Sequence, residues 1–527
     1  MAHVSRLPRP HDRIAGALGG LILAGFAAPA FAQDTAPILA AQAAEADAHC
    51  AGLTPLDGGE AGVAAGLVIS ACQRDAMTSH AVIRWAATAD AVAYGASAAA
   101  GLPILLKDNI ETADMPTTAG SLALANNAPG RDAPLVTRLR AAGFLILGKT
   151  NLSEWANIRS TRSISGWSAV GGLTPNPYDA TRTACGSSSG SAVAVAVGLA
   201  PVAIGTETNG SIVCPASVNG VVGFKPTVGL VSRTHIVPIS HSQDTAGPIA
   251  ATVHDAALVL TAIAGSDPMD AATVEADMRK VDYVAALDAD SLRGARIGVL
   301  RFLANNFSDD TKAAFERSLQ AMRDAGAELV EITEGPDMRA IGGAQLTVLL
   351  TELKVDLNAY LSSTDPKQVP TRTLAEVIAF NAAEPHETVL FGQELFERAE
   401  ATGGLEDPAY VTARETSLRL SGVEGIDRMM AENRVAALVS PTTSRAWTND
   451  RDDEDEGQGS ASTLAAVAGY PHLTVPMGMD RGMPVGISFM AGAWQDATVL
   501  SLGYAFEQKT MARRAPGERA PAGQDAQ

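Results

Sequence analysis

The sequence predicts an α/β protein with a single large mixed, mostly parallel β-sheet covered by helices on both faces. Apolar runs of strand length alternate with amphipathic helical segments, which is typical of β-α-β units. No internal repeat and no linker rich in Pro, Gly or Ser divides the 527 residues. Only 18% of the residues are charged whereas 46% are hydrophobic, so we expect a large core and a small surface.

The first strand–helix–strand succession begins near residue 102. Leu102–Leu106 is a short apolar run that ends in Lys107. Pro134–Ala142 predicts a helix, which Gly143 ends. Phe144–Leu147 then predicts the next strand.

A second succession begins near residue 296. Arg296–Leu300 predicts a strand, Asp309–Ala325 a helix that Gly326 follows, and Leu329–Ile332 another strand. The helix carries three apolar residues at helical spacing: Phe315, Leu319 and Met322.

Three further segments differ from this pattern. Residues 335–433 are mostly helical and predict a cap-like segment within a domain that spans 33–513. Asp450–Glu456 holds six acids and one Arg, which indicates a solvated loop. Arg514–Gln527 predicts a flexible C-terminal tail.

The first 32 residues predict a secretory signal peptide. Three arginines precede an apolar stretch at 14–26, and Ala30 and Ala32 then flank Phe31. The apolar stretch is shorter than the ~20 residues that a membrane-spanning helix needs. We therefore expect cleavage after Ala32, export to the periplasm or the medium, and no membrane span in the mature chain.

The charge balance bears on partners. The formal net charge is −19, and removal of three Arg and one Asp with the signal peptide takes it to −21. Nucleic-acid binding requires a surplus of Lys and Arg, so we expect no nucleic-acid partner. No sequence pattern sets an oligomeric state.

The four cysteines are too few to form the framework of a chain this long. Cys50 and Cys72 flank an N-terminal segment and could pair. Cys185 and Cys214 lie inside motifs described below and are expected to be small buried residues. No metal-binding motif is present, so neither a metal nor a cofactor is expected.

The stretch from Cys185 to Pro248 is the most unusual part of the chain. It contains CGSSSGS at 185–191, GTETNGSI at 205–212 and GFKPT at 223–227. Dense Gly and Ser permit unusual backbone conformations and let a substrate approach the main chain. A flexible loop is the alternative, but the first motif leads directly into a small-residue helix.

One catalytic interpretation uses Gly186–Gly190, which matches the G-x-S-x-G motif of a nucleophile elbow with Ser188 as nucleophile. The elbow requires a strand directly before it, and residues 176–182 are not a buried strand. Its triad would need a later His, for which His241 or His472 is available, although neither lies in a distinctive motif. This interpretation is the weaker of two.

The other interpretation joins Lys107, Ser187 and Ser211. By itself, Lys107 is typical of a solvated strand end. Together with the surrounding motifs, however, the chain closely resembles the amidase signature family of serine hydrolases over roughly residues 102–514. Besides the Gly/Ser motifs, the resemblance rests on KDN at 107–109, TTAGS at 117–121, GKTN at 148–151, SQDTAGP at 242–248, SPTT at 440–443, AGYP at 468–471, VPMG at 475–478 and GMPVG at 482–486.

The resemblance implies the amidase signature fold and a Ser–cis-Ser–Lys triad without metal or cofactor. Carried over position by position, Lys107 is the base, Ser187 the bridging serine in a cis peptide, and Ser211 the nucleophile. A free Lys has a pKa near 10.4, so burial must lower the pKa of Lys107 before it can accept a proton at neutral pH.

The resemblance also implies an oxyanion hole formed by backbone N–H groups of Thr208, Asn209, Gly210 and Ser211. Many relatives have Gly where this chain has Asn209, and this departure bears on the shape of the hole.

Within the family, the chain is most similar to bacterial peptide amidases, in residues 151–157, 164–169, 185–191 and 205–215. That likeness implies release of ammonia from the C-terminal amide of peptides. Other acyl, aryl or fatty amides are the alternative, and an aminoacyl-tRNA substrate is disfavoured because an exported chain would not meet it. A non-catalytic exported binding protein is a further alternative, against which the joint presence of the three triad residues argues.

Overall fold

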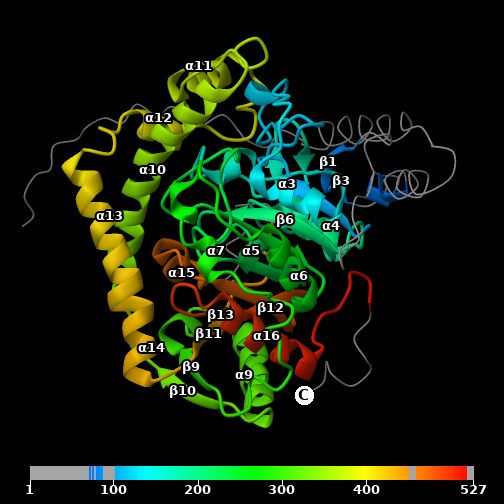
Figure 1. Ribbon diagram of the computed structural model, residues 1–527, viewed down its shortest axis with the longest axis vertical. Coiled ribbons are helices and arrows are strands. Elements are labelled where there is room, and N and C mark those ends of the chain that lie inside the picture. Colours follow the sequence, from blue (N-terminus) through cyan, green and yellow to red (C-terminus); the bar gives the residue numbers. More distant parts are fainter. Residues whose placement is uncertain (1–69, 73, 76–78, 87–100, 450–458, 519–527) are drawn as a thin grey trace, which may run out of the picture. The chain divides into compact units, whose positions relative to one another are not determined.

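A computed structural model describes residues 70–72, 74–75, 79–86, 101–449 and 459–518 (Figure 1). The predicted signal peptide at 1–32, Cys50 and the acidic loop at 450–456 lie outside the described residues, as does most of the tail at 514–527. Those expectations stay predictions.

Eleven strands form one mixed sheet within the described residues, which confirms the predicted fold class. Their order is β1-β3-β2-β6-β8-β7-β12-β13-β11-β9-β10. A separate two-stranded sheet joins β4 (Trp167–Ser168) and β5 (Gly172–Leu173). The strands of the large sheet are β1 (Val82–Trp85), β2 (Pro103–Lys107), β3 (Leu145–Thr150), β6 (Val202–Glu207), β7 (Val222–Lys225), β8 (Thr245–Ala250), β9 (Arg296–Leu300), β10 (Glu328–Ile332), β11 (Ala437–Pro441), β12 (His472–Asp480) and β13 (Met483–Met490).

Parallel pairing is confined to two groups of three strands. β2 is parallel to β3 and β6, and β9 is parallel to β10 and β11. The other six strand pairs are antiparallel, so the expected parallel majority is not found. The two strand–helix–strand successions seen in the sequence build parallel pairs. The short turn between β12 and β13 allows only antiparallel pairing, and the other antiparallel pairs in the middle of the sheet join strands with longer connections.

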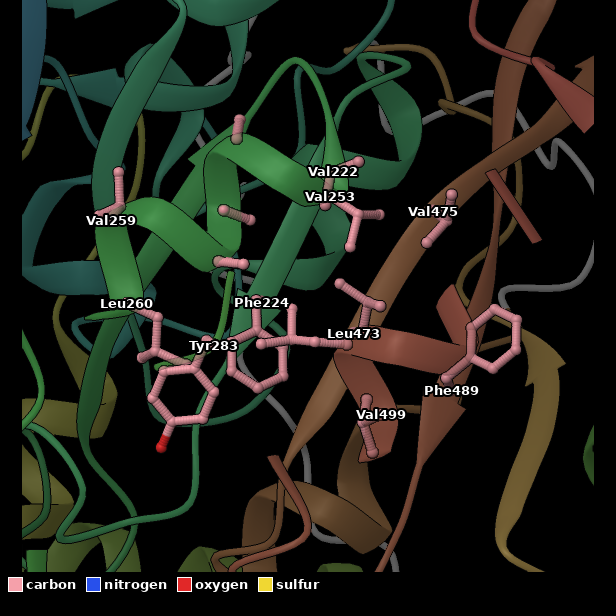
Figure 2. Close-up of a cluster of buried hydrophobic side chains, with 14 of the residues drawn as sticks. Val222, Phe224, Val253, Val259, Leu260, Tyr283, Leu473, Val475, Phe489 and Val499 are labelled. Carbon is pink, nitrogen blue, oxygen red and sulfur yellow. The ribbon is translucent and has the colours of Figure 1, made fainter. Parts of the chain in front are cut away.

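Helices cover both faces of the sheet, as predicted. In β2, Ile104 and Leu106 belong to one apolar cluster and Leu105 to another, because successive side chains point to opposite faces. Figure 2 shows part of the first cluster, with side chains from β7, β12, β13, α6 and α16. The helices of this face are α3 (Pro134–Ala141), α6 (Val253–Ile263), α9 (Asp309–Asp324) and α16 (Asp496–Thr510); those of the other face are α4 (Ser189–Ala196), α5 (Val213–Val218) and α15 (Ser462–Ala468).

The predicted cap-like segment at 335–433 is mostly helical. Its longest helix, α10 (Met338–Ser363), packs against α12 and α13, and α13 packs against α15 (Figure 1). In the described residues no helix has the length and apolar character needed to span a bilayer. The other helices of the segment are α11 (Leu374–Ala383), α12 (Glu394–Glu400), α13 (Pro408–Ser421), the π-helical η4 (Gly422–Asp427) and α14 (Arg428–Asn433). Elsewhere lie the short η1 (Leu122–Leu124), η2 (Glu154–Asn157), η3 (Ala271–Thr273), α7 (Ala276–Arg279) and α8 (Arg301–Ala304).

A buried ion cluster joins this helical segment to the rest of the chain. Arg159 Nε lies 3.1 Å from Glu154 Oε1, and its Nη1 lies 3.7 Å from Glu387 Oε2, with all three side chains fully buried. The guanidinium also lies 4.2 Å from the centre of the Phe391 ring. One guanidinium therefore contacts two buried acidic side chains, and burial together with the nearby Glu387 raises the pKa of Glu154 well above its usual value.

Replacement of this cation should destabilise the fold. We expect Arg159→Met to lower the free energy of unfolding by about 3–5 kcal/mol, because the buried pair of acidic side chains would lose its counter-charge. Guanidinium unfolding followed by circular dichroism measures the change. As a control, Arg293→Met removes an exposed ion pair with Asp290, and we expect an effect within about 0.5 kcal/mol. Equal effects of the two substitutions would contradict this account of the cluster.

Candidate active site

The three predicted catalytic residues come together at one edge of the sheet. Lys107 is the last residue of β2, and Ser187 lies in the loop before α4. Ser211 lies in the loop between β6 and α5. Because β2 and β6 are parallel neighbours, their carboxyl ends meet at the same edge, and the residues that follow β6 lie beside Lys107.

Lys107 is fully buried and surrounded by oxygen atoms. Its Nζ lies 2.7 Å from Ser187 Oγ and 2.9 Å from Thr206 Oγ1, with the Thr206 carbonyl oxygen at 3.3 Å. Asn109 Nδ2 donates to the same Thr206 hydroxyl at 3.0 Å. The contact with Thr206, whose hydroxyl Asn109 also binds, therefore holds the Lys107 amine next to Ser187 Oγ.

Burial lowers the pKa of Lys107 to about 7, because the buried ammonium has lost the water that would stabilise its charge. The carboxylates of Asp244 and Glu207 raise the same pKa, but their effect is smaller than that of burial. Burial also raises the pKa of Asp244 to about 6. At neutral pH a substantial fraction of Lys107 is therefore the neutral amine, which carries a lone pair for a proton.

The loop before α4 fixes Ser187 through its backbone. The Gly186–Ser187 peptide bond is cis, as the family resemblance implied. The Ser187 carbonyl accepts the Ser153 N–H at 3.0 Å, and the next residue, Ser188, donates its N–H to the Ser211 carbonyl at 3.1 Å. A Cβ at Gly186 would overlap Ser153 Oγ, so only glycine fits directly before Ser187.

In the described part of the chain, the four residues of the predicted oxyanion hole have unpaired backbone N–H groups. Among the described residues, the backbone N–H groups of Thr208, Asn209, Gly210 and Ser211 have no hydrogen-bond partner, and neither has the Ser211 hydroxyl. Glu207 Oε2 instead accepts the next two N–H groups of the chain, at 2.8 and 3.1 Å. Gly210 has φ +85°, a left-handed conformation that glycine adopts readily. The loop thus presents unpaired donors around Ser211, an arrangement suited to binding an anionic oxygen.

Asn209, the departure from many relatives, is held by its own contacts. Its Nδ2 donates to Gln345 Oε1 at 3.1 Å and to Thr463 Oγ1 at 3.3 Å, and its Oδ1 accepts from Ser462 Oγ at 2.7 Å. These partners lie on α10 and α15. The side chain is therefore engaged by the two helices.

The nucleophile-elbow alternative is not assembled. Ser188 Oγ donates to the Thr206 carbonyl at 3.1 Å, and neither histidine drafted for its triad bonds to it. His472 Nε2 lies 2.6 Å from Ser488 Oγ, and burial lowers its pKa to about 3. His241 Nδ1 instead lies 2.9 Å from Asp356 Oδ2. In addition, no strand directly precedes residue 186.

One expectation about the cysteines is wrong. Cys185 and Cys214, expected to be separate buried thiols, form a disulfide with a Cα–Cα distance of 6.0 Å. The loops that carry them are 29 residues apart in sequence, and only their meeting at the sheet edge makes the pairing possible. Cys72 also takes part in a disulfide. Because Cys50 lies outside the described residues, its pairing with Cys72 stays a prediction.

Residues whose roles the sequence did not reveal complete the site. The Thr206 hydroxyl accepts a hydrogen bond from Lys107 Nζ, and Asp244 accepts one from Thr208 Oγ1 at 2.5 Å. Glu207 accepts the N–H groups of the two residues that follow Ser211. All of them lie inside the motifs noted above, but neither spacing nor residue type showed which atoms they contact. A cavity of about 340 Å³ lies beside them and is lined in part by Asn109, Thr206, Thr208 and Asp244.

A separate group of possible metal ligands lies in the described part of the chain. Ligand atoms of His241, Glu352 and Asp356 lie within 4.8 Å of one another. They already contact one another, and Glu352 Oε1 also accepts from the Tyr410 hydroxyl at 2.7 Å. The group joins the segment before β8 to α10 and contains none of Lys107, Ser187 and Ser211, although His241 and Asp356 line the same cavity as Asp244.

Comparisons with known proteins agree on one family. A family model described as Amidase matches residues 70–500. A probable amidase of Arabidopsis thaliana is 40% identical over 426 residues, which are 79% of this chain and 78% of that protein. The glutamyl-tRNA(Gln) amidotransferase subunit of a Synechococcus species is 35% identical over 421 residues, 78% of this chain and 79% of that one. Among solved structures, the peptide amidase of Stenotrophomonas maltophilia is 49% identical with a TM-score of 0.80, covering 86% of this chain and 95% of that one.

Proposed function

Because the chain belongs to the amidase family and is a hydrolase that acts on amide C–N bonds, we propose that it releases ammonia from the C-terminal amide of peptides. In this proposal Lys107, Ser187 and Ser211 are the catalytic residues. The observation that carries it is the buried 2.7 Å contact between Lys107 Nζ and Ser187 Oγ, beside the loop that holds Ser211.

The proton path follows from the order of the three groups. Ser211 Oγ attacks the amide carbonyl and passes its proton to Ser187, whose own hydroxyl proton goes to the neutral amine of Lys107. Lys107 and Ser187 are already in contact in the free protein. The Ser211 hydroxyl, which has no partner in the described part of the chain, would turn toward Ser187 when substrate is bound.

The same part of the site stabilises the negative charge on the substrate oxygen and protonates the leaving nitrogen. The oxygen that becomes negative when Ser211 attacks would accept hydrogen bonds from N–H groups of the 208–211 loop. The C–N bond then breaks, and the nitrogen takes a proton returned by Lys107 through Ser187, so ammonia leaves. Water attacks the acyl–Ser211 ester and gives its proton to the same relay. The carboxylic acid departs and the Ser211 hydroxyl is restored.

Likeness to peptide amidase supports the choice of substrate. Besides the Stenotrophomonas enzyme, a structure of peptide amidase in complex with the competitive inhibitor chymostatin is 48% identical and covers 92% of this chain and 100% of that one, with a TM-score of 0.80. Other acyl, aryl or fatty amides are the alternative, because the family includes amidases whose names state no peptide substrate.

We also propose that the protein is exported to the periplasm or the medium. The basic, apolar and small-residue order of residues 1–32 supports export. The Cys185–Cys214 disulfide supports it independently, because disulfides persist mainly in oxidising compartments. Export argues against the aminoacyl-tRNA substrate of the amidotransferase relatives, which a cytosolic partner would supply.

Substitution of the triad tests the mechanism. We expect Ser211→Ala, Ser187→Ala and Lys107→Ala each to lower kcat for a peptide amide by about a thousandfold or more, with an unchanged circular dichroism spectrum. Ammonia release measures the rate. Ser188→Ala is the matched control, and we expect it to lower kcat by no more than about tenfold. In the described residues, the hydrogen-bond partners of Ser188 Oγ are the carbonyl and N–H groups of Thr206. A dead Ser188→Ala with an active Ser211→Ala would establish the elbow instead.

The pH dependence follows from the Lys107 pKa of about 7. Below that value Lys107 is protonated and cannot accept the Ser187 proton, so kcat/KM should fall about tenfold for each pH unit and level off above pH 8. Asp244→Asn should move the midpoint to lower pH, because the Asp244 carboxylate raises the pKa of Lys107. A profile that stays flat to pH 5 would rule out a neutral Lys107 as the base.

A substrate panel tests the peptide-amide assignment. The four members are a dipeptide amide, the same dipeptide with a free carboxylate, a fatty amide and a short aliphatic amide. We expect kcat/KM to be greatest for the dipeptide amide and no cleavage of the free dipeptide. Equal rates on the three amides would leave the amidase activity standing and refute the peptide preference.

A further inference from the structure

The Cys185–Cys214 disulfide joins the two segments that carry the serines of the proposed triad. Cys185 precedes Ser187 by two residues, and Cys214 follows Ser211 by three. The bond therefore connects the loop before α4 to the first turn of α5. The disulfide therefore belongs to the segments of the proposed active site and is not a cross-link elsewhere in the fold.

Both half-cystines are tied to the backbone that carries the catalytic groups. The Cys185 N–H donates to Thr183 Oγ1 at 3.0 Å, and the Cys185 carbonyl accepts from Ser189 Oγ in the first turn of α4. Cys185 has φ +52°, a left-handed conformation that residues other than glycine rarely adopt. On the other side, the Cys214 N–H donates to the Gly210 carbonyl at 2.8 Å, within the oxyanion segment.

The relative position of the two loops is critical for proton transfer. A relay between hydroxyls operates over about 2.6–3.2 Å, and a displacement near 1 Å can cost about a hundredfold in rate. A backbone hydrogen bond of 3.1 Å, from Ser188 N–H to the Ser211 carbonyl, also joins the loops. A covalent bond restricts their separation more strongly than this single contact.

We propose that the Cys185–Cys214 disulfide is a positioning cross-link that holds Ser187 in register with Ser211, so that full amidase activity requires the oxidised protein. The proposal rests on the proposed function of the two serines. Reduction by a dithiol breaks the S–S bond, delivers two electrons and two protons to give the thiols of Cys185 and Cys214, and converts the reductant to its own disulfide.

The proposal connects activity to the compartment in which the chain folds. In a reducing cytosol the pair would remain as two thiols, whereas an oxidising compartment would form the bond. A protein that carries the predicted signal peptide would therefore reach full activity only after export.

The test uses the Cys185→Ala/Cys214→Ala double variant of the full chain. Two rates are compared with wild type well below the unfolding temperature of either protein: phosphonylation of Ser211 by a fluorophosphonate, and kcat for a dipeptide amide. We expect both to fall at least about tenfold, with KM changed less than threefold, because the cross-link orients reacting groups and does not bind substrate.

Cys72→Ala is the matched control, because it removes the other described half-cystine, which lies outside both loops. We expect it to lower the unfolding temperature while the two rates stay within twofold of wild type. A purely stabilising role for Cys185–Cys214 would give this same outcome for the double variant.

Reversible reduction keeps the proposal testable if the double variant does not fold. The Cys72→Ala protein treated with a phosphine reductant should lose phosphonylation rate in step with loss of the remaining disulfide, and should regain it after reoxidation. An unchanged rate in fully reduced, folded protein would overturn the proposal. Failure of wild type to be labelled at Ser211 would instead refute the proposed function, so the two failures are distinguishable.

Discussion

The proposed role of Lys107 as a base requires that its amine be uncharged at neutral pH, and burial away from water lowers its pKa in that direction. The three residues before it in β2 are completely buried, because β3 and β6 flank the strand and helices cover both faces. At the end of this strand Lys107 Nζ forms hydrogen bonds with the hydroxyls of Ser187 and Thr206 and with the Thr206 carbonyl oxygen. Burial outweighs the two nearby carboxylates, and the pKa falls to about 7. The proposed chemistry of the site thus depends on how completely the sheet and its covering helices bury the Lys107 side chain.

The small Gly and Ser residues around Ser187 allow α4 to pack closely enough to keep this part of the protein buried. Every residue of α4 is buried, and the helix packs against the end of β3 at very short range. A Cβ on Gly190 would lie 2.6 Å from the Asn151 carbonyl oxygen, and the Gly190 N–H donates to that oxygen at 3.0 Å. The composition that could have indicated a flexible loop is instead what close packing requires. Because the helix cannot move outward without breaking these contacts, the loop before it is held in place as well.

Local patterns predicted much of this arrangement. Lys107 lies at a strand end as predicted, both strand–helix–strand successions are present, and residues 335–433 are mostly helical. What the sequence could not show depends on residues far apart in the chain. Thr206 contacts Lys107 across 99 positions because β2 and β6 are neighbours, and Cys185 meets Cys214 across 29 positions. The antiparallel centre of the sheet was missed for the same reason, since strand order is set by packing of the whole domain and carries no local signal.

Asn209 shows how a departure from the family pattern acquires a structural consequence. A glycine at this position could form none of the three side-chain hydrogen bonds that Asn209 makes. These bonds reach Gln345 of α10 and two residues at the start of α15, so the segment with the free N–H groups is attached to the helical segment as well as to the sheet. The position of α10 therefore bears directly on the loop of Ser211. In this chain the helical segment is therefore part of the support of the site.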